Sequence, residues 1–345
     1  MKLAVLFGGA SFEHEISIVS AVTIKSKLES FDLDFIFCDT DHKFYYIKDT
    51  KMKADTFSKK EYKKMPVLLL QERGFLKQAL LKKEVISATV LNLIHGADGE
   101  DGVIASMLDF YKIPFIGPRT PACVFSFNKL YTKYLSQGLG IKSMPFEVLH
   151  KTDARDVFTS LPLIIKPATL GSSIGVSIVK HQEELDYALD VAFEFDSCVI
   201  IEPFVKDIKE YNLAGCMIDG KINYSIIEEP HKNEFLDFDK KYMDFSRSST
   251  ALKAEIDNFL ETKIKNTFAK IYTHMFEGAL IRCDFFVMDG EIYLNEINPI
   301  PGSMANYLFD DFSMIVSGLA HSLPVKKQIT CKYEYIHSLS SAKGK

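Results

Sequence analysis

Apolar runs alternate with amphipathic stretches over the first third of the chain. Runs typical of buried strands cover 2–7, 34–39, 89–96 and 113–117, and residues 13–29 and 101–111 have the periodicity of helices. Strands that alternate with helices predict a parallel sheet with helices on its faces. Residues 48–66 are rich in lysine and weakly patterned, so we expect a peripheral connection there.

The remaining two thirds read as a mixture of helices and mainly antiparallel strands. We expect helices over 120–138, 182–194 and 254–276, with strands between them at 146–150, 161–167, 175–179 and 198–205. Residues 210–229 predict two strands around an Asp-Gly turn. The order predicts an α/β amino-terminal domain (1–117), followed by two α+β domains (118–203 and 204–345).

A second predicted hairpin, within 278–302, carries polar residues only at its open end. Side chains alternate faces along a strand, so Arg282 and Asp284 share one face of the first strand, and Glu296 and Asn298 one face of the second. A turn with an odd number of residues, such as three with Gly290 in the left-handed position, would bring both sets to one face. Clustered oxygen atoms of this kind bind Mg²⁺.

Two alternatives to this metal site stay open at this point. A two-residue turn would place the two polar sets on opposite faces and remove the site. The hairpin could also be an ordinary surface hairpin with solvated charges.

Composition narrows the class of protein. The chain has 345 residues, 47% of them hydrophobic, which allows a large core in two or three domains. The net charge is −5 and the basic residues are scattered, which argues against a nucleic-acid partner. The first apolar run is too short for a signal peptide or a membrane span. Six isolated cysteines are typical of reduced thiols, so we expect a cytoplasmic protein without a membrane partner.

A glycine-rich loop joins two predicted strands at 166–175, with the sequence KPATLGSSIG. Glycines and hydroxyls in a loop can present backbone N–H groups to phosphate oxygens, and Lys166 adds a point charge. The spacing is not that of a Walker motif, and a strand rather than a helix follows. A plain hairpin loop is the alternative.

Glu202 ends the next apolar strand and is followed by Pro203, Phe204 and Val205, with Glu210 further on. An adenine ring needs an apolar slot and hydrogen bonds along one edge, which such a segment can supply. Glu202 could equally be an exposed residue at the end of a strand.

Two polar loops follow strands of the predicted parallel sheet, where ligands usually bind. In GGASFEHEIS (8–17), Glu13 occupies the third glycine position of the dinucleotide motif; a carboxylate there repels a pyrophosphate but suits a substrate ammonium. The alternative is that Ser11 caps the helix and Glu13 favours its dipole. In HGADGEDG (95–102), His95 is either structural or turned towards a ligand.

Residues 228–250 mix aromatic and charged side chains without a clear period. A connection this long inside a compact domain is usually functional or disordered. Its aromatic residues favour a lid that packs down over a site.

These motifs together resemble the D-alanine–D-alanine ligases of the ATP-grasp superfamily, from about residue 3 to residue 312. The resemblance rests on GGASFEHEIS, HGADGEDG, KPATLGSSIGV (166–176), DFDKKY (237–242) and the RCD, NEIN and PG motifs within 282–302. It implies a three-domain ATP-grasp fold whose first domain is Rossmann-like. It also implies ATP-dependent joining of two D-alanine molecules through an acyl phosphate, for peptidoglycan precursor synthesis.

The same resemblance implies the groups that bind ATP and two Mg²⁺ (or Mn²⁺) ions. Glu202, Phe204 and Val205 would frame the adenine, and Glu210 the ribose. Asp284, Glu296 and Asn298 would hold the metals. The phosphate contacts would come from Lys129, Lys166, Gly171, Ser172, Ser173 and Gly175.

For the substrates, the resemblance implies that Glu13 binds the ammonium of the first D-alanine in a set with Ser172 and Tyr242. Arg282 and the Gly302 backbone would stabilise the tetrahedral oxyanion. The remaining substrate contacts would be His95, Lys241, Tyr307 and Leu308. A homodimer is also expected from the family.

The chain departs from the usual family pattern around the second substrate. Pro299 and Tyr307 stand where many members carry Thr and a smaller polar residue, and the sequence from Met243 differs from the commoner lid. The resemblance therefore leaves open the selectivity of that position. Related members that join D-alanine to D-serine or D-lactate are one alternative, and an ATP-binding sensor without ligase activity is another. The lack of G-x-G-x-x-G disfavours a dehydrogenase.

Overall fold

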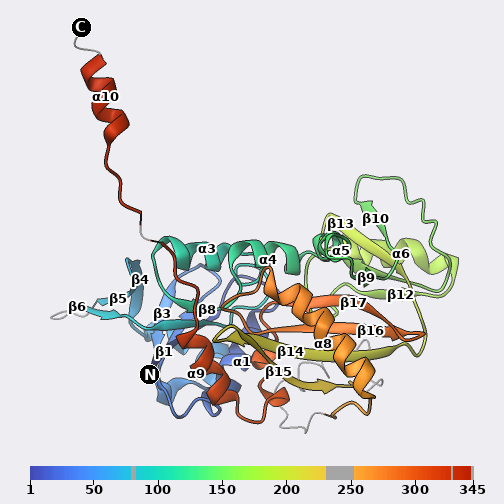
Figure 1. Ribbon diagram of the computed structural model, residues 1–345, viewed down its shortest axis with the longest axis horizontal. Helices are drawn as coiled ribbons and strands as arrows, with labels where there is room; N and C mark the ends of the chain where they lie inside the picture. Colours follow the sequence, from blue (N-terminus) through green and yellow to red (C-terminus); the bar gives the residue numbers. More distant parts are fainter. Residues whose placement is uncertain (79–82, 231–251, 328, 343–345) are drawn as a thin grey trace.

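The computed structural model describes residues 1–78, 83–230, 252–327 and 329–342. Within these residues the strands form three sheets of eight, four and five strands. Figure 1 shows the first sheet at one side of the molecule and the second at the other, with the third between them. None of the described helices is both long and apolar enough to cross a membrane.

The first sheet has the order β6-β5-β4-β3-β2-β1-β7-β8. Its parallel half matches the predicted strands, with α1 (His14–Lys25) and α3 (Val103–Phe110) following β1 and β7. An antiparallel extension, β3 to β6, was not predicted. The strands are β1 (Lys2–Gly8), β2 (Asp32–Cys38), β3 (Phe44–Ile47), β4 (Val67–Gln71), β5 (Gly74–Gln78), β6 (Lys83–Ile86), β7 (Thr89–Asn92) and β8 (Phe115–Ile116).

The segment 48–66 belongs to the core, so its prediction as a peripheral connection is wrong. It forms η1 (Asp49–Lys51), α2 (Ala54–Ser58) and η2 (Glu61–Lys64). Phe57 and Tyr62 are buried, and their rings contact the ring of Phe37. Two aromatic residues thus anchor a segment whose lysines face solvent.

The second sheet has the order β10-β13-β11-β12 and carries the glycine-rich loop between β11 and β12. One face is covered by α6 (Leu185–Phe193), which follows η3 (Gln182–Glu184). The strands are β10 (Glu147–His150), β11 (Leu163–Pro167), β12 (Ser177–Val179) and β13 (Cys198–Pro203).

The predicted helix 120–138 is two helices, α4 (Thr120–Phe127) and α5 (Lys129–Gly138). Asn128 between them has an extended backbone, and its side chain accepts hydrogen bonds from the N–H groups of Leu130 and Tyr131 at 2.9 and 3.3 Å. Asparagine favours this capping role over a helix interior. The break sets the direction of α5, which carries Lys129 and Lys133.

The third sheet has the order β15-β14-β16-β17-β9. Both hairpins predicted for this part of the chain are present, and α8 (Asn258–Thr273) packs against β14 and β15. β9 lies within the predicted central domain yet pairs with β17; the domain boundaries remain a prediction. The strands are β9 (Lys142–Ser143), β14 (Lys209–Ile218), β15 (Lys221–Glu228), β16 (Ile281–Met288) and β17 (Glu291–Asn298).

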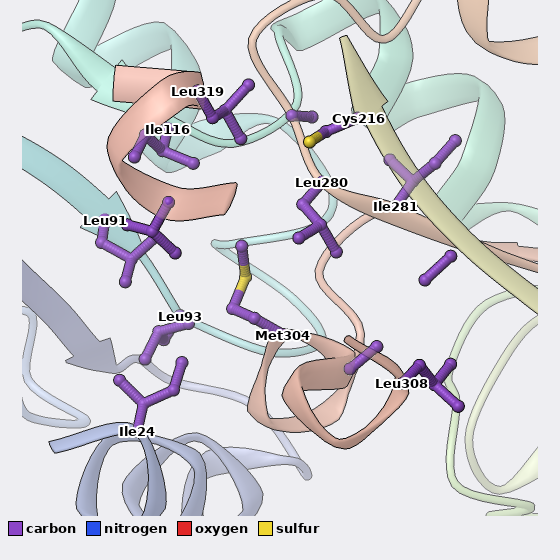
Figure 2. Packing of buried hydrophobic residues seen from close by; sticks show 14 of the residues in the cluster. Ile24, Leu91, Leu93, Ile116, Cys216, Leu280, Ile281, Met304, Leu308 and Leu319 are labelled. Carbon is purple, nitrogen blue, oxygen red and sulfur yellow. The ribbon is translucent and has the colours of Figure 1, made fainter. Parts of the chain in front are cut away.

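A continuous hydrophobic core joins the first and third sheets through η5 (Gly302–Leu308). Figure 2 shows Met304 of η5 between Leu93, which follows β7, and Leu280, which precedes β16. α9 (Phe312–His321) adds Leu319 to this core. The last helix, α10 (Glu334–Ala342), stands apart from the rest of the molecule in Figure 1.

Candidate active site

The turn of the β16–β17 hairpin contains two residues, Asp289 and Gly290, so the predicted odd-length turn is wrong. Met288 pairs with Glu291, and both turn residues have positive φ, as in a type I′ turn. With an unbroken ladder this turn would have placed the polar residues of β16 and β17 on opposite faces.

A β-bulge in β17 supplies the extra residue instead. Asp284 pairs with Glu296, but Phe285 pairs with Leu294, which leaves Asn295 unpaired in the ladder. The bulge reverses the alternation of faces beyond it. Paired residues point to the same face, so Asp284 and Glu296 lie together, as the sequence predicted for another reason.

The neighbouring pair of this ladder is Arg282 and Asn298, which therefore join the same face. The bulge also sets the face of the apolar residues between it and the turn. Ile292 and Leu294 of β17 pair with Val287 and Phe285, on the face opposite to Asp284, and are buried in the core.

Hydrogen bonds tie these polar groups into one cluster. The Arg282 guanidinium donates to both oxygens of Asp284, at 2.7 and 2.8 Å, and Asn298 Nδ2 donates to Asp284 Oδ2 at 3.0 Å. Burial raises the pKa of Asp284 to about 6, and the adjacent carboxyl of Glu296 adds to the shift. Burial acts in the same direction on Glu296, but the charge of Lys129, a hydrogen bond with Asp284 and the charges of Arg282 and Lys166 together outweigh it and lower the pKa of that carboxyl.

The donor set of this cluster fits a hard divalent cation. It offers carboxylate and amide oxygens on one face, and Mg²⁺ is usually bound by one or two carboxylates together with substrate phosphates and water. In the described part of the chain no group of three His, Cys, Asp or Glu side chains is placed to hold a metal. Asp284 and Glu296 therefore supply only part of a coordination shell, as expected for a metal shared with a nucleotide.

Three buried charges lie beside the metal candidates. Glu202, at the end of β13, forms ion pairs with Lys166 of β11 at 2.7 Å and with Lys133 of α5. Burial opposes the ionisation of Glu202, but the two lysines outweigh it and lower its pKa to about 2. Glu202 is therefore an ionised, buried side chain, and the alternative of an exposed strand end is excluded.

Lys133 was missed by the sequence reasoning. It follows Lys129 by one helical turn, so both lie on the same face of α5. Its Nζ also donates to the Met144 carbonyl at 3.2 Å. The available signal was two lysines four residues apart on a helix face whose other buried residues are Thr132 and Ser136. Burial lowers the pKa of both Lys129 and Lys133.

The glycine-rich loop has an unusual backbone. Leu170, Ser172, Ser173 and Gly175 have positive φ, a conformation typical of loops whose successive N–H groups bind anions. A Cβ on Gly175 would meet Phe195 and Pro167 at 2.8 Å, so this position requires glycine. The Lys129 ammonium donates to the Leu170 carbonyl and thus lies directly against the loop.

Glu13, the residue before α1, is a buried carboxylate that contacts this loop. Ser172 Oγ donates to its Oε1 at 2.8 Å, whereas Oε2 is buried and has no hydrogen-bond partner among the described residues. Positions 96 and 171 lie close to this carboxylate, and glycine at both leaves space there. Ser11 is not the helix cap: its hydroxyl accepts from the Glu13 N–H and donates to the His95 carbonyl.

The loop 95–102 contributes two buried titratable groups. His95 Nε2 lies 2.9 Å from Ser20 Oγ, and its Nδ1 lies 3.7 Å from Glu100 Oε1. Burial lowers the pKa of His95 and raises the pKa of Glu100 to about 8. His95 therefore has protein neighbours on both sides of its ring, which favours a structural role over direct substrate binding.

The other predicted substrate residues fall into three groups. The Leu308 side chain is buried in the core, so only its backbone is free for a substrate. The Tyr307 hydroxyl donates to Glu228 at 3.3 Å, close to Arg282. Lys241, Tyr242 and most of the predicted lid lie outside the described residues, as does Met243.

The predicted adenine segment continues from Glu202 along the loop that joins β13 to β14. The Phe204 N–H donates to the Pro162 carbonyl at 2.9 Å, and Phe204 and Val205 are half-buried. Glu210 lies near the start of β14, where it pairs with Phe286 of β16. This segment thus leads from the lysine–glutamate cluster to the sheet that carries the metal candidates.

Comparison with known families decides the family of the chain. Residues 2–118 match the family model described as "D-ala D-ala ligase N-terminus", and residues 135–323 match "D-ala D-ala ligase C-terminus". The chain belongs to the D-alanine–D-alanine ligase family. The curated D-alanine–D-alanine ligase of Sulfurimonas denitrificans is 60% identical over 345 residues, with both chains covered in full, and that of Wolinella succinogenes is 55% identical over 346.

Solved structures of a D-alanine–D-alanine ligase and of a D-Ala:D-Ser ligase have the same fold. The crystal structure of the Helicobacter pylori enzyme matches with a TM-score of 0.84 and 48% identity, and the match covers 95% of this chain and 100% of that one. The VanG D-Ala:D-Ser ligase of Enterococcus faecalis matches with a TM-score of 0.74 and 25% identity, over 93% and 97% of the two chains. The predicted ATP-grasp fold is confirmed, and membership makes the chain an ATP-dependent ligase.

Proposed function

We propose that this protein joins two D-alanine molecules to D-alanyl-D-alanine at the expense of ATP, for peptidoglycan precursor synthesis. The observation that carries the proposal is Glu13, a buried carboxylate with one oxygen held by Ser172 and the other unpartnered among the described residues. A substrate ammonium would satisfy that oxygen. Full-length identity of 60% to a curated D-alanine–D-alanine ligase supports the same reaction.

The lysines and the loop 171–175 suit the phosphates of ATP, and Glu202, Phe204, Val205 and Glu210 suit its adenosine. Lys129 donates to the Leu170 carbonyl of the loop, and Lys166 lies near the end of β11, which precedes it. Neutralising phosphate charge is the main requirement of phosphoryl transfer. Asp284, Glu296 and Asn298 would hold two Mg²⁺ or Mn²⁺ ions. Bound there, the metals would withdraw charge from the phosphates.

In the first step an oxygen of the substrate carboxylate attacks the γ-phosphorus of ATP, and ADP leaves. Two anions approach each other, so Lys129 and Lys166 are needed to reduce their repulsion. The Glu13 carboxylate binds the ammonium of the first D-alanine and so orients this substrate. Ser172 holds the Glu13 carboxylate in place, and Tyr242 completes the set. The product is an acyl phosphate. A lid formed by residues 228–250 would protect it from water.

In the second step the amine of the second D-alanine attacks the acyl carbon, and the tetrahedral intermediate collapses by expelling phosphate. Arg282 and the Gly302 N–H would stabilise the oxyanion of that intermediate. Lys241, Tyr307 and the Leu308 backbone would bind the second carboxylate. His95 would act on this site through its neighbours.

The acceptor is the part of the proposal that a single assay tests best. With D-alanine, Mg²⁺ and ATP we expect ADP, phosphate and D-alanyl-D-alanine in equal amounts. D-lactate, offered beside D-alanine, should give little mixed product, because Tyr242 favours an amine as the acceptor. D-serine also carries an amine, so a separate reaction with D-serine tests whether the site distinguishes between two amino acids. Mass spectrometry of the three reactions identifies the products. No D-alanyl-D-alanine would overturn the proposal, and a dominant mixed product would favour the alternative acceptor.

We further propose a cytoplasmic homodimer. All six cysteines are free, in keeping with a reducing compartment. Light scattering behind a size-exclusion column should give twice the chain mass of 39.1 kDa. A single-chain mass at every concentration tested would contradict the dimer.

A further inference from the structure

The segment that contains Gly302 has a backbone that needs external support. The next three residues, Ser303, Met304 and Ala305, have φ of 47°, 54° and 47°. L-residues rarely adopt one left-handed conformation and very rarely three in succession, because Cβ crowds the following carbonyl. Such a turn persists only where its surroundings hold it, and it is found mainly at functional sites.

Two contacts within the segment provide part of this support. The Met304 N–H donates to the Pro301 carbonyl at 2.7 Å, and Asn306 Nδ2 donates to the Ser303 carbonyl at 2.9 Å. The Met304 side chain is buried in the core between the first and third sheets, as Figure 2 shows.

A further support comes from the helix α1, through Ser20. Ser20 is fully buried, and its Oγ accepts a hydrogen bond of 3.0 Å from the Ser303 N–H. The same Oγ lies 2.9 Å from His95 Nε2, so a hydrogen bond joins these two side chains.

His95 reaches the other side of Gly302. Burial lowers the pKa of its imidazole, and a hydrogen bond to the Ile300 backbone opposes that shift. His95 therefore contacts Ile300, two residues before Gly302, directly. It contacts Ser303, one residue after Gly302, through Ser20. α1 packs against η5 along this contact.

We propose that Ser20 and His95 are positioning residues that hold the strained turn and thereby aim the Gly302 N–H at the developing oxyanion. The inference rests on the proposed function, in which Gly302 acts in the second step alone. Formation of the acyl phosphate does not need this N–H. Loss of the support should therefore slow dipeptide formation and spare the transfer of phosphate from ATP.

Single-turnover reactions quenched in acid separate the two steps, since ADP reports the first and D-alanyl-D-alanine the second. For Ser20→Ala we expect dipeptide formation to slow by about 10- to 100-fold, the size of effect produced by misplacing a catalytic group by about 1 Å. ADP formation should slow by less than about threefold, and the KM for ATP should stay within about twofold, because nothing that contacts ATP has changed. Acyl phosphate that is not captured hydrolyses, so the ratio of phosphate to dipeptide rises above one.

Ser17→Ala is the matched control. Ser17 is a buried serine of the same helix, and its hydroxyl accepts from the Gly8 N–H at 2.8 Å and donates to the Leu93 carbonyl at 2.6 Å, away from the turn. It should leave the ratio of phosphate to dipeptide at one. His95→Gln provides a second variant should Ser20→Ala not fold, and the two changes combined should cost little more than either alone.

An equal slowing of both steps in Ser20→Ala, or an unchanged rate of dipeptide formation, would overturn the positioning role. If the wild-type enzyme makes dipeptide but Ser20→Ala gives either of these two results, only the inference about Ser20 and His95 fails. If the wild-type enzyme makes no dipeptide, the proposed function fails and the inference with it.

Discussion

Glu296→Gln is expected to reduce dipeptide formation on the order of 1000-fold, a loss typical of removing one charged group that stabilises a phosphoryl or acyl transfer. Glu296 lies beside Asp284 on the polar face of the hairpin, and Lys129 and Arg282 keep its pKa low. Glutamine keeps the shape and one oxygen but removes the negative charge. A divalent cation would then have one carboxylate in place of two.

The fold should survive Glu296→Gln, since the substitution leaves the β16–β17 ladder unchanged. Circular dichroism and thermal unfolding check this, and ADP release with D-alanine measures activity. Glu291→Gln is the matched control: it lies on the same strand, pairs with Lys142 and Lys263 near the turn, and should keep nearly full activity. Substantial turnover by Glu296→Gln would show that this carboxylate holds no essential metal.

Glu202→Leu is expected to lower the free energy of unfolding by about 3–5 kcal/mol, the usual cost of removing one partner from a buried ion pair. Among the described residues, Glu202 alone forms ion pairs with both Lys133 and Lys166. All three side chains are largely buried. Two ammonium groups would be left in the interior without their carboxylate. Urea or thermal unfolding measures the loss.

Two comparisons separate this effect from a general loss of packing. Glu261→Leu removes a carboxylate from the half-exposed pair with Lys265 on α8 and should cost less than about 1 kcal/mol. Replacing Lys133 and Lys166 by methionine in the Glu202→Leu background should recover much of the stability, because an apolar trio leaves no charge unpaired. Failure to recover would show that Glu202 stabilises the fold in another way.

The pH dependence of this cluster follows from the depressed pKa of Glu202, about 2. A carboxyl with a lower pKa in the folded state binds fewer protons there than in the unfolded chain. The contribution of Glu202 to the free energy of unfolding is complete above the ordinary pKa of a glutamate. It is lost as the pH falls from that value towards 2. The stability difference between wild type and Glu202→Leu should therefore shrink in acid.

Local patterns in the sequence predict most of the elements but not those that depend on distant partners. Strands of the parallel half, the helix α1 and both Asp-Gly hairpins follow from alternation and turn chemistry alone. The segment 48–66 does not, because only Met52, Phe57 and Tyr62 of its apolar side chains are buried in the core, and Phe37, which the two rings contact, lies on β2. Three apolar residues spread among lysines have no strand or helix period, so the pattern indicates a surface connection.

The candidate site shows the same division. The loop 171–175, the lysines and the carboxylates carry their chemistry in their side chains, so the motifs identify them. Ser20 does not, because its role depends on the Ser303 N–H, more than 280 residues away in the chain. The break between α4 and α5 at Asn128 could be predicted only in part. Asparagine is a capping residue, but the apolar residues on both sides of it favour one long helix.

The bulge at Asn295 has a consequence for how this hairpin tolerates change. The polar end of β17 depends on the parity of the residue count between Asp284 and Glu296, and the turn and the bulge both enter that count. One residue gained or lost anywhere in this interval would exchange the polar and apolar faces, whereas two would not. Length variation in this hairpin is therefore permitted in even steps, unless a compensating residue appears elsewhere in the same interval.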